Sequence, residues 1–127
     1  MKLKIGKFSK LCNIPVKTLR YYDDIDLFKP SEIDLFSGYR YYTEEQLDDI
    51  YLIMELKEAG FSLLEIRDNW NNWNDEYFLR QKEKVFQEQK LLNERIKKLD
   101  ELRTRIAHGM IYKERVDDVL LRRKDWL

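Results

Sequence analysis

The sequence has 127 residues, enough for one small globular domain with an appended element. Charged residues make up 38% of the chain and cancel to a net charge of zero, so no overall basic field points to a polyanionic partner. The single cysteine, Cys12, excludes an intramolecular disulfide and a cysteine-rich zinc site. No segment approaches the roughly 20 apolar residues that a membrane span needs, so we expect a soluble cytoplasmic protein.

Positive charge is concentrated near the N-terminus. Residues 2–20 contain no carboxylate, whereas residues 23–58 are mostly acidic. We therefore expect a basic face confined to one end of the chain, and such a face suits the phosphates of a nucleic acid. The cations of this stretch are Lys2, Lys4, Lys7, Lys10, Lys17 and Arg20.

Two short helices are predicted close to the N-terminus. Ile5, Phe8 and Leu11 recur at helical spacing, so this segment should form a short amphipathic helix with these three residues on its apolar face. Asn13 can adopt the left-handed conformation that ends a helix, and Pro15 fits at or beside the first position of the next helix. The pattern predicts a helix, a short turn and a second helix.

The second helix has an apolar face, on which Val16, Leu19 and Tyr22 should point toward the first helix. The opposite face crowds long donors and a phenol onto barely more than one turn, and such a surface suits phosphates and base edges. This is the helix-turn-helix arrangement, in which the second helix enters the major groove of DNA. In isolation the same residues could be solvated cations and half-buried aromatics, so the flanking segments decide. The outward residues are Lys17, Thr18, Arg20 and Tyr21.

Residues 29–42 change from helical to turn and strand character. Pro30 stops a helix, Ser37-Gly38 is a turn signal, and residues 39–42 favour an extended strand. We predict a small β-hairpin, or wing, at this position. It must pack against the helices, because a two-stranded hairpin is unstable alone.

Two further helices are predicted at roughly 43–59 and 62–73. Each begins at a capping box, and Gly60 lies between them, where the C-terminus of a helix requires it. The capping boxes are Thr43-x-x-Gln46 and Ser62-x-x-Glu65. The residues expected in the core are Leu47, Ile50, Tyr51, Met54 and Leu56 from the first helix, and Leu63, Ile66 and Trp70 from the second.

A long helix is predicted from residue 75 to about residue 108, where strong helix formers dominate and proline and glycine are absent. Such a helix would be about 50 Å long and could not bury its apolar stripe against the N-terminal part alone. A second copy of the chain is the simplest partner, which gives a two-fold dimer. The stripe is an imperfect heptad seam of Phe78, Val85, Leu92, Ile96, Leu99, Ile106 and Met110.

The predicted fold class is mainly α. A winged helix-turn-helix domain with a small β-hairpin wing occupies residues 1–73, a coiled-coil dimerisation helix follows at 75–110, and a short charged tail ends the chain at 111–127. No nucleophile, general base or phosphate-binding loop is recognisable, so we expect no enzyme, no cofactor and no metal site.

Taken in order, these motifs resemble the MerR family of bacterial transcription regulators. Within that family, the sequence from Ile25 to Pro30 resembles the multidrug-responsive activators. The resemblance covers residues 1 to about 70 by motif and 75–110 by architecture. Asp26 stands where many members have glycine, but aspartate also tolerates a positive φ. The matching motifs are Ile5-Gly6, Thr18-Leu19-Arg20-Tyr21-Tyr22-Asp23, Leu27, Pro30, Gly38-Tyr39-Arg40-Tyr41-Tyr42, and Gly60-Phe61-Ser62-Leu63 before Glu65-Ile66.

The resemblance implies a homodimer, joined by an antiparallel coiled coil, that binds a near-palindromic operator in double-stranded promoter DNA. The regulator would act at the nucleoid by bending and untwisting a promoter whose two polymerase-recognition elements are too far apart, so RNA polymerase is an implied partner. Tyr22 would lie nearer to the core than its neighbours. The DNA-binding residues implied are Lys17, Thr18, Arg20, Tyr21 and Tyr22 in the recognition helix, Tyr39, Arg40 and Tyr41 in the wing, and the phosphate-contacting Lys57.

The resemblance also implies a C-terminal effector domain, yet the residues after the long helix are too few for the ligand-binding barrel of the multidrug activators. Either the sequence belongs to a longer chain, or it is a short member that senses through its tail or a partner. A small-molecule effector therefore stays open, as does the choice between activator and repressor. The alternative function is a coiled-coil interaction module, or a regulator partner without an effector domain of its own.

Three features have both a functional and a structural interpretation. Cys12 could be a metal or redox sensor, but metal-sensing relatives carry several thiols, so a small buried residue fits better. His108 has no second histidine or cysteine nearby and is expected at the last turn of the long helix. An aromatic cluster between the domain and the coiled coil is either core packing or a drug pocket. Its members are Trp70, Trp73, Tyr77 and Phe78.

Overall fold

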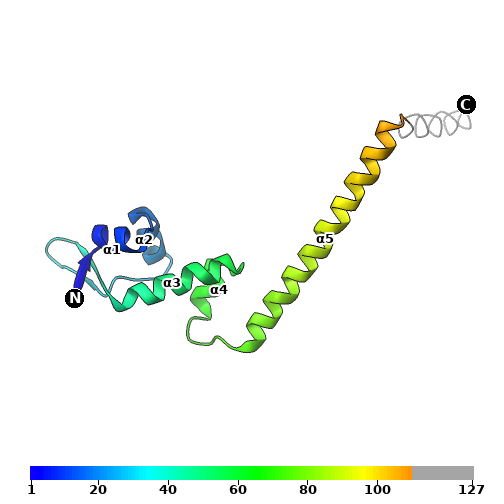
Figure 1. Cartoon of the computed structure of the whole chain (residues 1–127). Coiled ribbons are helices and arrows are strands. Elements are labelled where there is room, and N and C mark those ends of the chain that lie inside the picture. Colours follow the sequence, from blue (N-terminus) through cyan, green and yellow to red (C-terminus); the bar gives the residue numbers. More distant parts are fainter. Residues whose placement is uncertain (110–127) are drawn as a thin grey trace, which may run out of the picture. The chain divides into compact units, whose positions relative to one another are not determined.

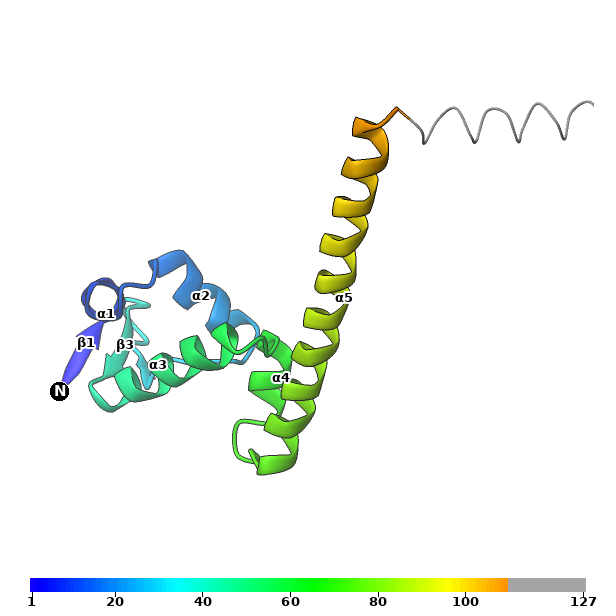
Figure 2. The same cartoon turned by 45° about the vertical axis from the view of Figure 1, so that its right-hand side comes forward.

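The computed structural model describes residues 1–109. These residues form two compact units, the first from Met1 to Gln81 and the second from Lys82 onward. Figure 1 shows the short helices and strands of the first unit and the long helix that leads into the second, and Figure 2 shows the same elements turned by 45°.

The described elements confirm the prediction of a mainly helical winged domain followed by a long helix. In chain order they are β1 (Lys2–Lys4), α1 (Ile5–Cys12), α2 (Val16–Asp24), β2 (Glu32–Ile33), β3 (Arg40–Thr43), α3 (Glu45–Glu58), α4 (Leu63–Asp68) and α5 (Asp75–Ala107).

The turn between α1 and α2 forms as the sequence predicts. Asn13 ends α1 in the left-handed conformation, with φ of 56°, and its amide donates to the Ser9 carbonyl oxygen. Pro15 is extended and immediately precedes α2, so its missing N–H costs the helix no hydrogen bond. α1 contacts α2, α3, β1 and β3, so it joins the helices to the sheet.

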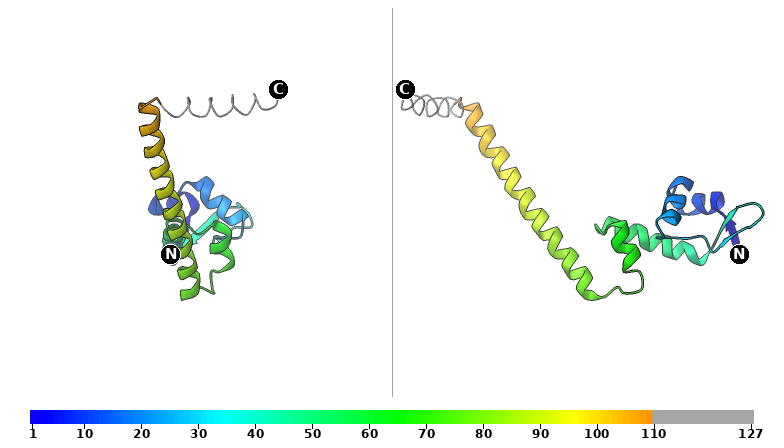
Figure 3. Two further views of the ribbon diagram at one scale, coloured as in Figure 1. Left: turned by 90° about the vertical axis from the view of Figure 1, so that its right-hand side faces the viewer. Right: turned by 180° about the vertical axis from the view of Figure 1, so that it is seen from behind.

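A three-stranded antiparallel sheet lies beside the helices in the order β1-β3-β2. β2 and β3 form the predicted wing, whose loop extends beyond α1 on the side of the unit away from α4 (Figure 1; Figure 3). The sequence analysis missed β1, which pairs Leu3 with Tyr42. Both side chains are buried, so this third strand fixes the hairpin to the core.

The core lies between α1, α2, α3 and the sheet. Three aromatic rings stack at its centre, where the Phe8 centroid lies 4.5 Å from that of Tyr42 and 5.9 Å from that of Phe28. The buried hydrophobic residues are Leu3, Phe8, Cys12, Ile14, Leu19, Tyr22, Phe28, Tyr42, Ile50, Ile53, Leu56, Phe61 and Ile66.

Two residues expected on apolar helix faces lie at the surface, so this part of the prediction is wrong. Leu11 is 50% exposed, because the buried side of α1 centres on Phe8 and Cys12 and Leu11 lies at its edge. Tyr51 is 43% exposed, because its neighbour Ile50 takes the inward position on α3. The Tyr51 hydroxyl donates to the Leu11 carbonyl oxygen at 3.3 Å, so the two residues meet at the surface of α1 and α3.

Each predicted capping box forms one of its two characteristic hydrogen bonds. Before α3, the Gln46 side chain accepts from the Thr43 amide at 3.0 Å. At the start of α4, the Ser62 hydroxyl accepts from the Glu65 amide at 3.1 Å. Either bond satisfies a backbone donor that the helix itself cannot pair, so both boxes mark helix starts correctly.

α4 ends at Asp68, earlier than the predicted boundary near residue 73. The side-chain amide of Asn69 donates to the Glu65 carbonyl oxygen at 2.9 Å, and the chain then turns. An asparagine that bonds to nearby backbone competes with continued helix, which gives the shortening a local cause.

The aromatic cluster packs ring against ring within the first unit. The Trp73 centroid lies 5.0 Å from that of Phe61 and 5.6 Å from that of Phe78, and Tyr77 meets Trp73 edge to face. Trp70 and Trp73 both pack against the core. These contacts favour the core-packing interpretation of the cluster. They also give Phe78, predicted as a seam residue, a partner within its own chain.

α5 carries the predicted apolar stripe, and none of its residues is buried. Its seam side chains from Val85 to Ile106 are between 47% and 66% exposed. Isolated surface hydrophobics are common, but a heptad stripe of this length needs a second surface to cover it. Met110, the last predicted seam residue, and the tail 111–127 lie outside the described residues.

The two candidate sensor residues are placed by the fold. Cys12 is buried, and burial raises the pKa of its thiol, so it fits the packing interpretation. His108 follows the last residue of α5. Among residues 1–109, no three histidine, cysteine, aspartate or glutamate side chains gather where they could hold a metal ion. Within the same range, no helix is long and apolar enough to cross a membrane.

Candidate nucleic-acid interface

α2 presents a polar face to solvent. Lys17, Arg20 and Tyr21 are exposed, and Thr18 is half-buried. The helical repeat turns Leu19 fully inward, which leaves these four neighbours on the outer side. The predicted recognition residues therefore share a surface that a partner can reach.

A groove of about 630 Å³ opens beside this face, between α1, α2 and the wing. We call it the basic groove, because every charged residue that lines it is a lysine or an arginine. So many like charges repel one another, and an anionic ligand relieves the repulsion. The lining residues are Lys4, Ile5, Gly6, Lys7, Lys10, Arg20, Tyr39 and Arg40.

The wing contributes Tyr39 and Arg40 to the basic groove. The ammonium group of Lys4 lies 4.4 Å from the centroid of the Tyr39 ring, an arrangement that orders both side chains. Tyr41 is not part of the groove lining. Its carbonyl oxygen accepts from the amide and the hydroxyl of Ser31, at 2.9 and 3.1 Å, so its backbone closes the base of the wing.

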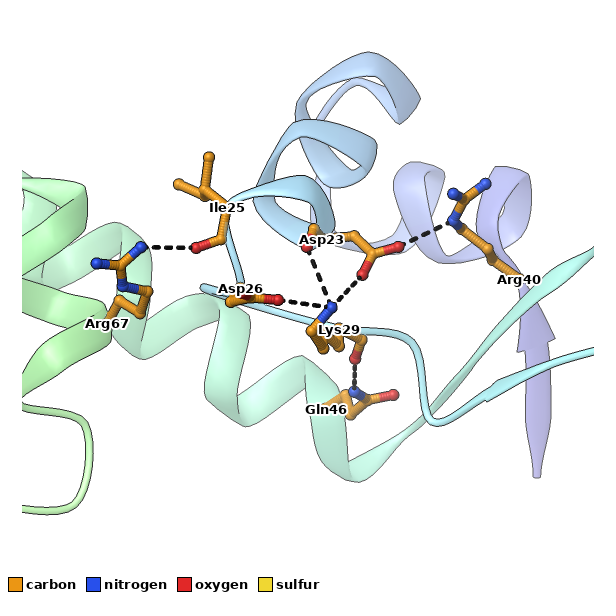
Figure 4. Close-up of polar contacts among 7 residues, drawn as sticks. All are labelled: Asp23, Ile25, Asp26, Lys29, Arg40, Gln46 and Arg67. Atoms are coloured by element: carbon orange, nitrogen blue, oxygen red, sulfur yellow. Dashed lines mark hydrogen bonds and ion pairs between the residues drawn. The ribbon is translucent and has the colours of Figure 1, made fainter.

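Arg40 is held at the basic groove by Asp23, near the end of α2 (Figure 4). Its Nε donates to Oδ2 of Asp23 at 3.1 Å. The two terminal nitrogens of the guanidinium point away from Asp23 and make no hydrogen bond within the described residues (Figure 4). They are therefore available to an anion.

Lys29 occupies the other oxygen of the same carboxylate. Its Nζ donates to Oδ1 of Asp23 at 3.1 Å and lies 2.8 Å from Oδ1 of Asp26. Asp26 and then Asp23 raise the pKa of Lys29 through these hydrogen bonds. Asp26 has φ of 60°, a positive value that aspartate tolerates. The pairs close a tight loop after the recognition helix.

Two further hydrogen bonds tie this loop to α3 and α4 (Figure 4). Gln46 Nε2 donates to the Lys29 carbonyl oxygen at 2.7 Å. Arg67 Nη1 donates to the Ile25 carbonyl oxygen at 3.1 Å. The end of α2 is thus braced from the wing, from α3 and from α4.

Tyr22 and Lys57 form a pair in which only the lysine faces solvent. Tyr22 is 4% exposed, so it lies nearer to the core than its neighbours, as the resemblance implies, and its contact with DNA stays a prediction. The Lys57 ammonium donates to the Tyr22 hydroxyl at 3.3 Å. The two belong to one site, with Tyr22 as the buried support.

The basic face expected from the run of cations in residues 2–20 supplies Lys4, Lys7 and Lys10 to the lining of the basic groove, although none of the three was named as a DNA-binding residue. The role of Asp23 was missed. Asp23 follows two tyrosines at the polar end of α2, and this position did not predict that its side chain is buried.

The chain is similar to known regulators along most of its length. The model of the MerR HTH family regulatory proteins matches residues 3–72. The multidrug-efflux transporter 1 regulator of Bacillus subtilis is 52% identical over 63 residues, which are 50% of this chain and 23% of that protein. The chain thus spans less than a quarter of the length of the curated relatives it matches first.

Two of the similar solved structures cover most of this chain. A MerR family transcriptional regulator from Bacillus cereus has a TM-score of 0.68 and 29% identity, covering 99% of this chain and 98% of that one. The EcmrR–DNA complex in EcmrR-RPo, a cryo-EM structure, has a TM-score of 0.68 and 32% identity, covering 84% of this chain and 39% of that one.

The wing, the two N-terminal helices and the exposed face of α2 together define a regulator of the winged helix-turn-helix class. The matched segment contains all of these elements. The chain belongs to the MerR family.

Proposed function

We propose that this chain is a homodimeric transcription regulator that binds promoter DNA in a sequence-specific manner. The observation that carries the proposal is the basic groove, which lies directly beside the exposed face of α2. A recognition helix flanked by cations is the arrangement that reads base edges while neighbouring phosphates hold the register.

The proposed contacts divide by chemistry. Lys17, Thr18, Arg20 and Tyr21 on α2 enter the major groove, where arginine can bond to base edges. A backbone phosphate lies in the basic groove, held by Arg40 and by the lysines of α1 and β1. Tyr39 packs beside it from the wing, Tyr41 supports the wing, and Lys57 holds a second phosphate with Tyr22 behind it.

Dimerisation through α5 is the second part of the proposal. The apolar stripes on α5 of two chains would pack against each other, which removes their side chains from water. A two-fold dimer presents two recognition helices, so its operator is a near-palindrome. The proposed seam comprises Phe78, Val85, Leu92, Ile96, Leu99, Ile106 and Met110.

The mode of action we propose is distortion of the promoter, which would let RNA polymerase engage two recognition elements that are too far apart. The neighbour solved as EcmrR–DNA complex in EcmrR-RPo supports a polymerase complex as the setting. This role places the protein in the cytoplasm, at the nucleoid. No catalytic step is part of this mode of action.

Fluorescence anisotropy with the full chain tests the proposal. Labelled duplexes tiled across the DNA upstream of the chain's own gene are titrated at low and at physiological salt. We expect one duplex to bind far more tightly than its neighbours, with two chains per duplex and a steep salt dependence. The double variant Lys17→Ala/Arg20→Ala should lose this preference, whereas Lys84→Ala/Lys90→Ala on α5 should keep it.

Absence of binding to every duplex at low salt would contradict the proposal. It would favour the alternative, a coiled-coil interaction module, for which the exposed stripe of α5 is the supporting observation. Pull-down partners of the full chain would then depend on Leu92 and Leu99 and not on Arg20.

A further inference from the structure

Asp23 is the buried charged residue of the described chain, with 8% of its surface exposed. A carboxylate removed from water is unfavourable unless cations and hydrogen bonds compensate it. An apolar residue at this position of α2 would avoid that cost. The position of Asp23 therefore calls for an explanation beyond the packing of the core.

The two oxygens of Asp23 are divided between cations from different parts of the chain. Oδ1 accepts from Lys29, in the loop after α2, and Oδ2 accepts from Arg40, on strand β3 of the wing. Figure 4 shows the carboxylate between the two cations. One side chain of α2 thus connects the helix to Arg40 on the wing.

The bond to Asp23 uses only part of the Arg40 guanidinium. Arginine has five N–H donors in a rigid plane, so Nε can bond to Asp23 while both terminal nitrogens stay open on the other side. A lysine has its three donors on one nitrogen at the end of a flexible chain, so it lacks a rigid plane that holds Asp23 on one side and a second anion at a fixed position on the other.

Arg40 shares the basic groove with Lys4, Lys7, Lys10 and Arg20. Without a counter-charge, repulsion among these cations would favour conformations in which the Arg40 side chain turns away into solvent. Asp23 compensates this repulsion from beneath the groove. The guanidinium is therefore already in place before any DNA arrives, and binding loses less side-chain entropy.

We infer that Asp23 is a positioning residue for DNA binding, which holds Arg40 through Nε so that its terminal nitrogens meet a backbone phosphate in the basic groove. The inference rests on the proposed function. The inference extends that function by giving a role to an anionic residue within a surface that binds a polyanion.

The sign of the effect separates this inference from simple electrostatics. Removal of a negative charge beside DNA should strengthen binding if charge alone matters. We expect the opposite for Asp23→Asn, a rise in Kd of about tenfold. Asp24→Asn removes the same charge from the exposed neighbouring residue and should leave Kd unchanged or lower it.

The experiment uses the full chain and the tightest duplex that the wild type selects from a randomised library. Kd is measured by anisotropy for wild type, Asp23→Asn, Arg40→Ala and the double variant, with thermal unfolding of each. The change at Asp23 should have little further effect once Arg40 is alanine. Equal effects of Asp23→Asn with and without Arg40, or tighter binding by Asp23→Asn, would overturn the inference.

Arg40→Lys provides a test that does not depend on the folding of Asp23→Asn. The lysine keeps the charge but lacks the rigid guanidinium plane that holds Asp23 on one side and a phosphate on the other, so its Kd should rise toward that of Arg40→Ala. Binding like wild type would overturn the inference. Failure of the wild type to select any duplex would instead contradict the proposed function itself.

Discussion

The Lys57 ammonium lies 3.3 Å from the Tyr22 hydroxyl and 5.9 Å from the centroid of its ring, so an exposed cation near the end of α3 rests on a buried residue of α2. The two residues appear together among the expected DNA contacts, yet only one of them faces solvent. Their roles can be separated by substitution.

Lys57→Ala should weaken binding to all DNA sequences to a similar extent, because a phosphate contact carries no base information. The slope of log K against log salt should become shallower by about 1. Tyr22→Phe keeps the buried ring and removes only the hydroxyl, so its effect should be smaller and in the same direction. Anisotropy titrations at several salt concentrations, with Lys90→Ala as control, provide the comparison. A Tyr22→Phe loss larger than that of Lys57→Ala would reverse the assignment.

Arg20→Ala should affect specificity as well as affinity. If Arg20 reads a base edge, its loss costs about 1–3 kcal/mol on the operator and much less on unrelated DNA. Lys7→Ala is the matched control, because Lys7 lines the same basic groove from α1 and is expected to touch only phosphate. The ratio of operator to non-operator affinity is the deciding measurement. An unchanged ratio in Arg20→Ala would assign Arg20 to the backbone as well.

The features that the sequence predicted correctly depend on short-range signals. Asn13 and Pro15 mark the ends of two helices, and each signal acts within one turn of chain. The wing was recognisable from Pro30 and Ser37-Gly38 for the same reason. Outward and inward residues of α2 followed from helical periodicity alone.

The features that were missed depend on contacts between distant segments. β1 forms because Leu3 pairs with Tyr42, which is distant in the sequence. No local sequence pattern predicts this pairing. Tyr51 could face inward by periodicity, but its neighbour Ile50 is fully buried and Tyr51 lies at the surface. The role of Asp23 depends on Arg40, which lies far along the chain. The shorter α4 is the exception, since its cause in Asn69 is local.

Tyr42→Phe should not destabilise the domain. The Tyr42 hydroxyl is buried without a hydrogen-bond partner in the described residues, and an unpaired buried hydroxyl is unfavourable. The unfolding free energy at neutral pH should stay the same or rise by about 1 kcal/mol, as measured by urea denaturation. A loss of similar size would show that the hydroxyl has a partner.

The same residue gives the domain a pH dependence at the alkaline end. Burial raises the pKa of Tyr42 to about 12, above its value of about 10 in an unfolded chain. A raised pKa means that the contribution to stability is complete below pH about 10 and is lost as the pH rises toward about 12. Tyr42→Phe should lack this loss. The unfolding free energy of the wild type should therefore decrease relative to that of the variant between pH about 10 and about 12, as measured by denaturation.

Dimerisation should depend on the middle of the α5 stripe. Leu92 and Leu99 are each more than half exposed in the single chain, and a buried leucine cut to alanine costs about 2–5 kcal/mol. Each change occurs twice in a symmetric dimer, so Leu92→Ala/Leu99→Ala should be monomeric at micromolar concentration. Operator affinity should fall with it, because each half-site alone offers few contacts.

The matched control is Gln87→Ala/Glu94→Ala, which has the same seven-residue spacing but lies on the opposite side of α5. It should remain dimeric and bind the operator like the wild type. Analytical ultracentrifugation run beside anisotropy measures both properties. Thermal unfolding of the first unit should be unchanged in both variants, because its core lies entirely before Lys82. A monomeric wild type, or a leucine variant that stays dimeric with unchanged affinity, would show that the stripe covers some other surface.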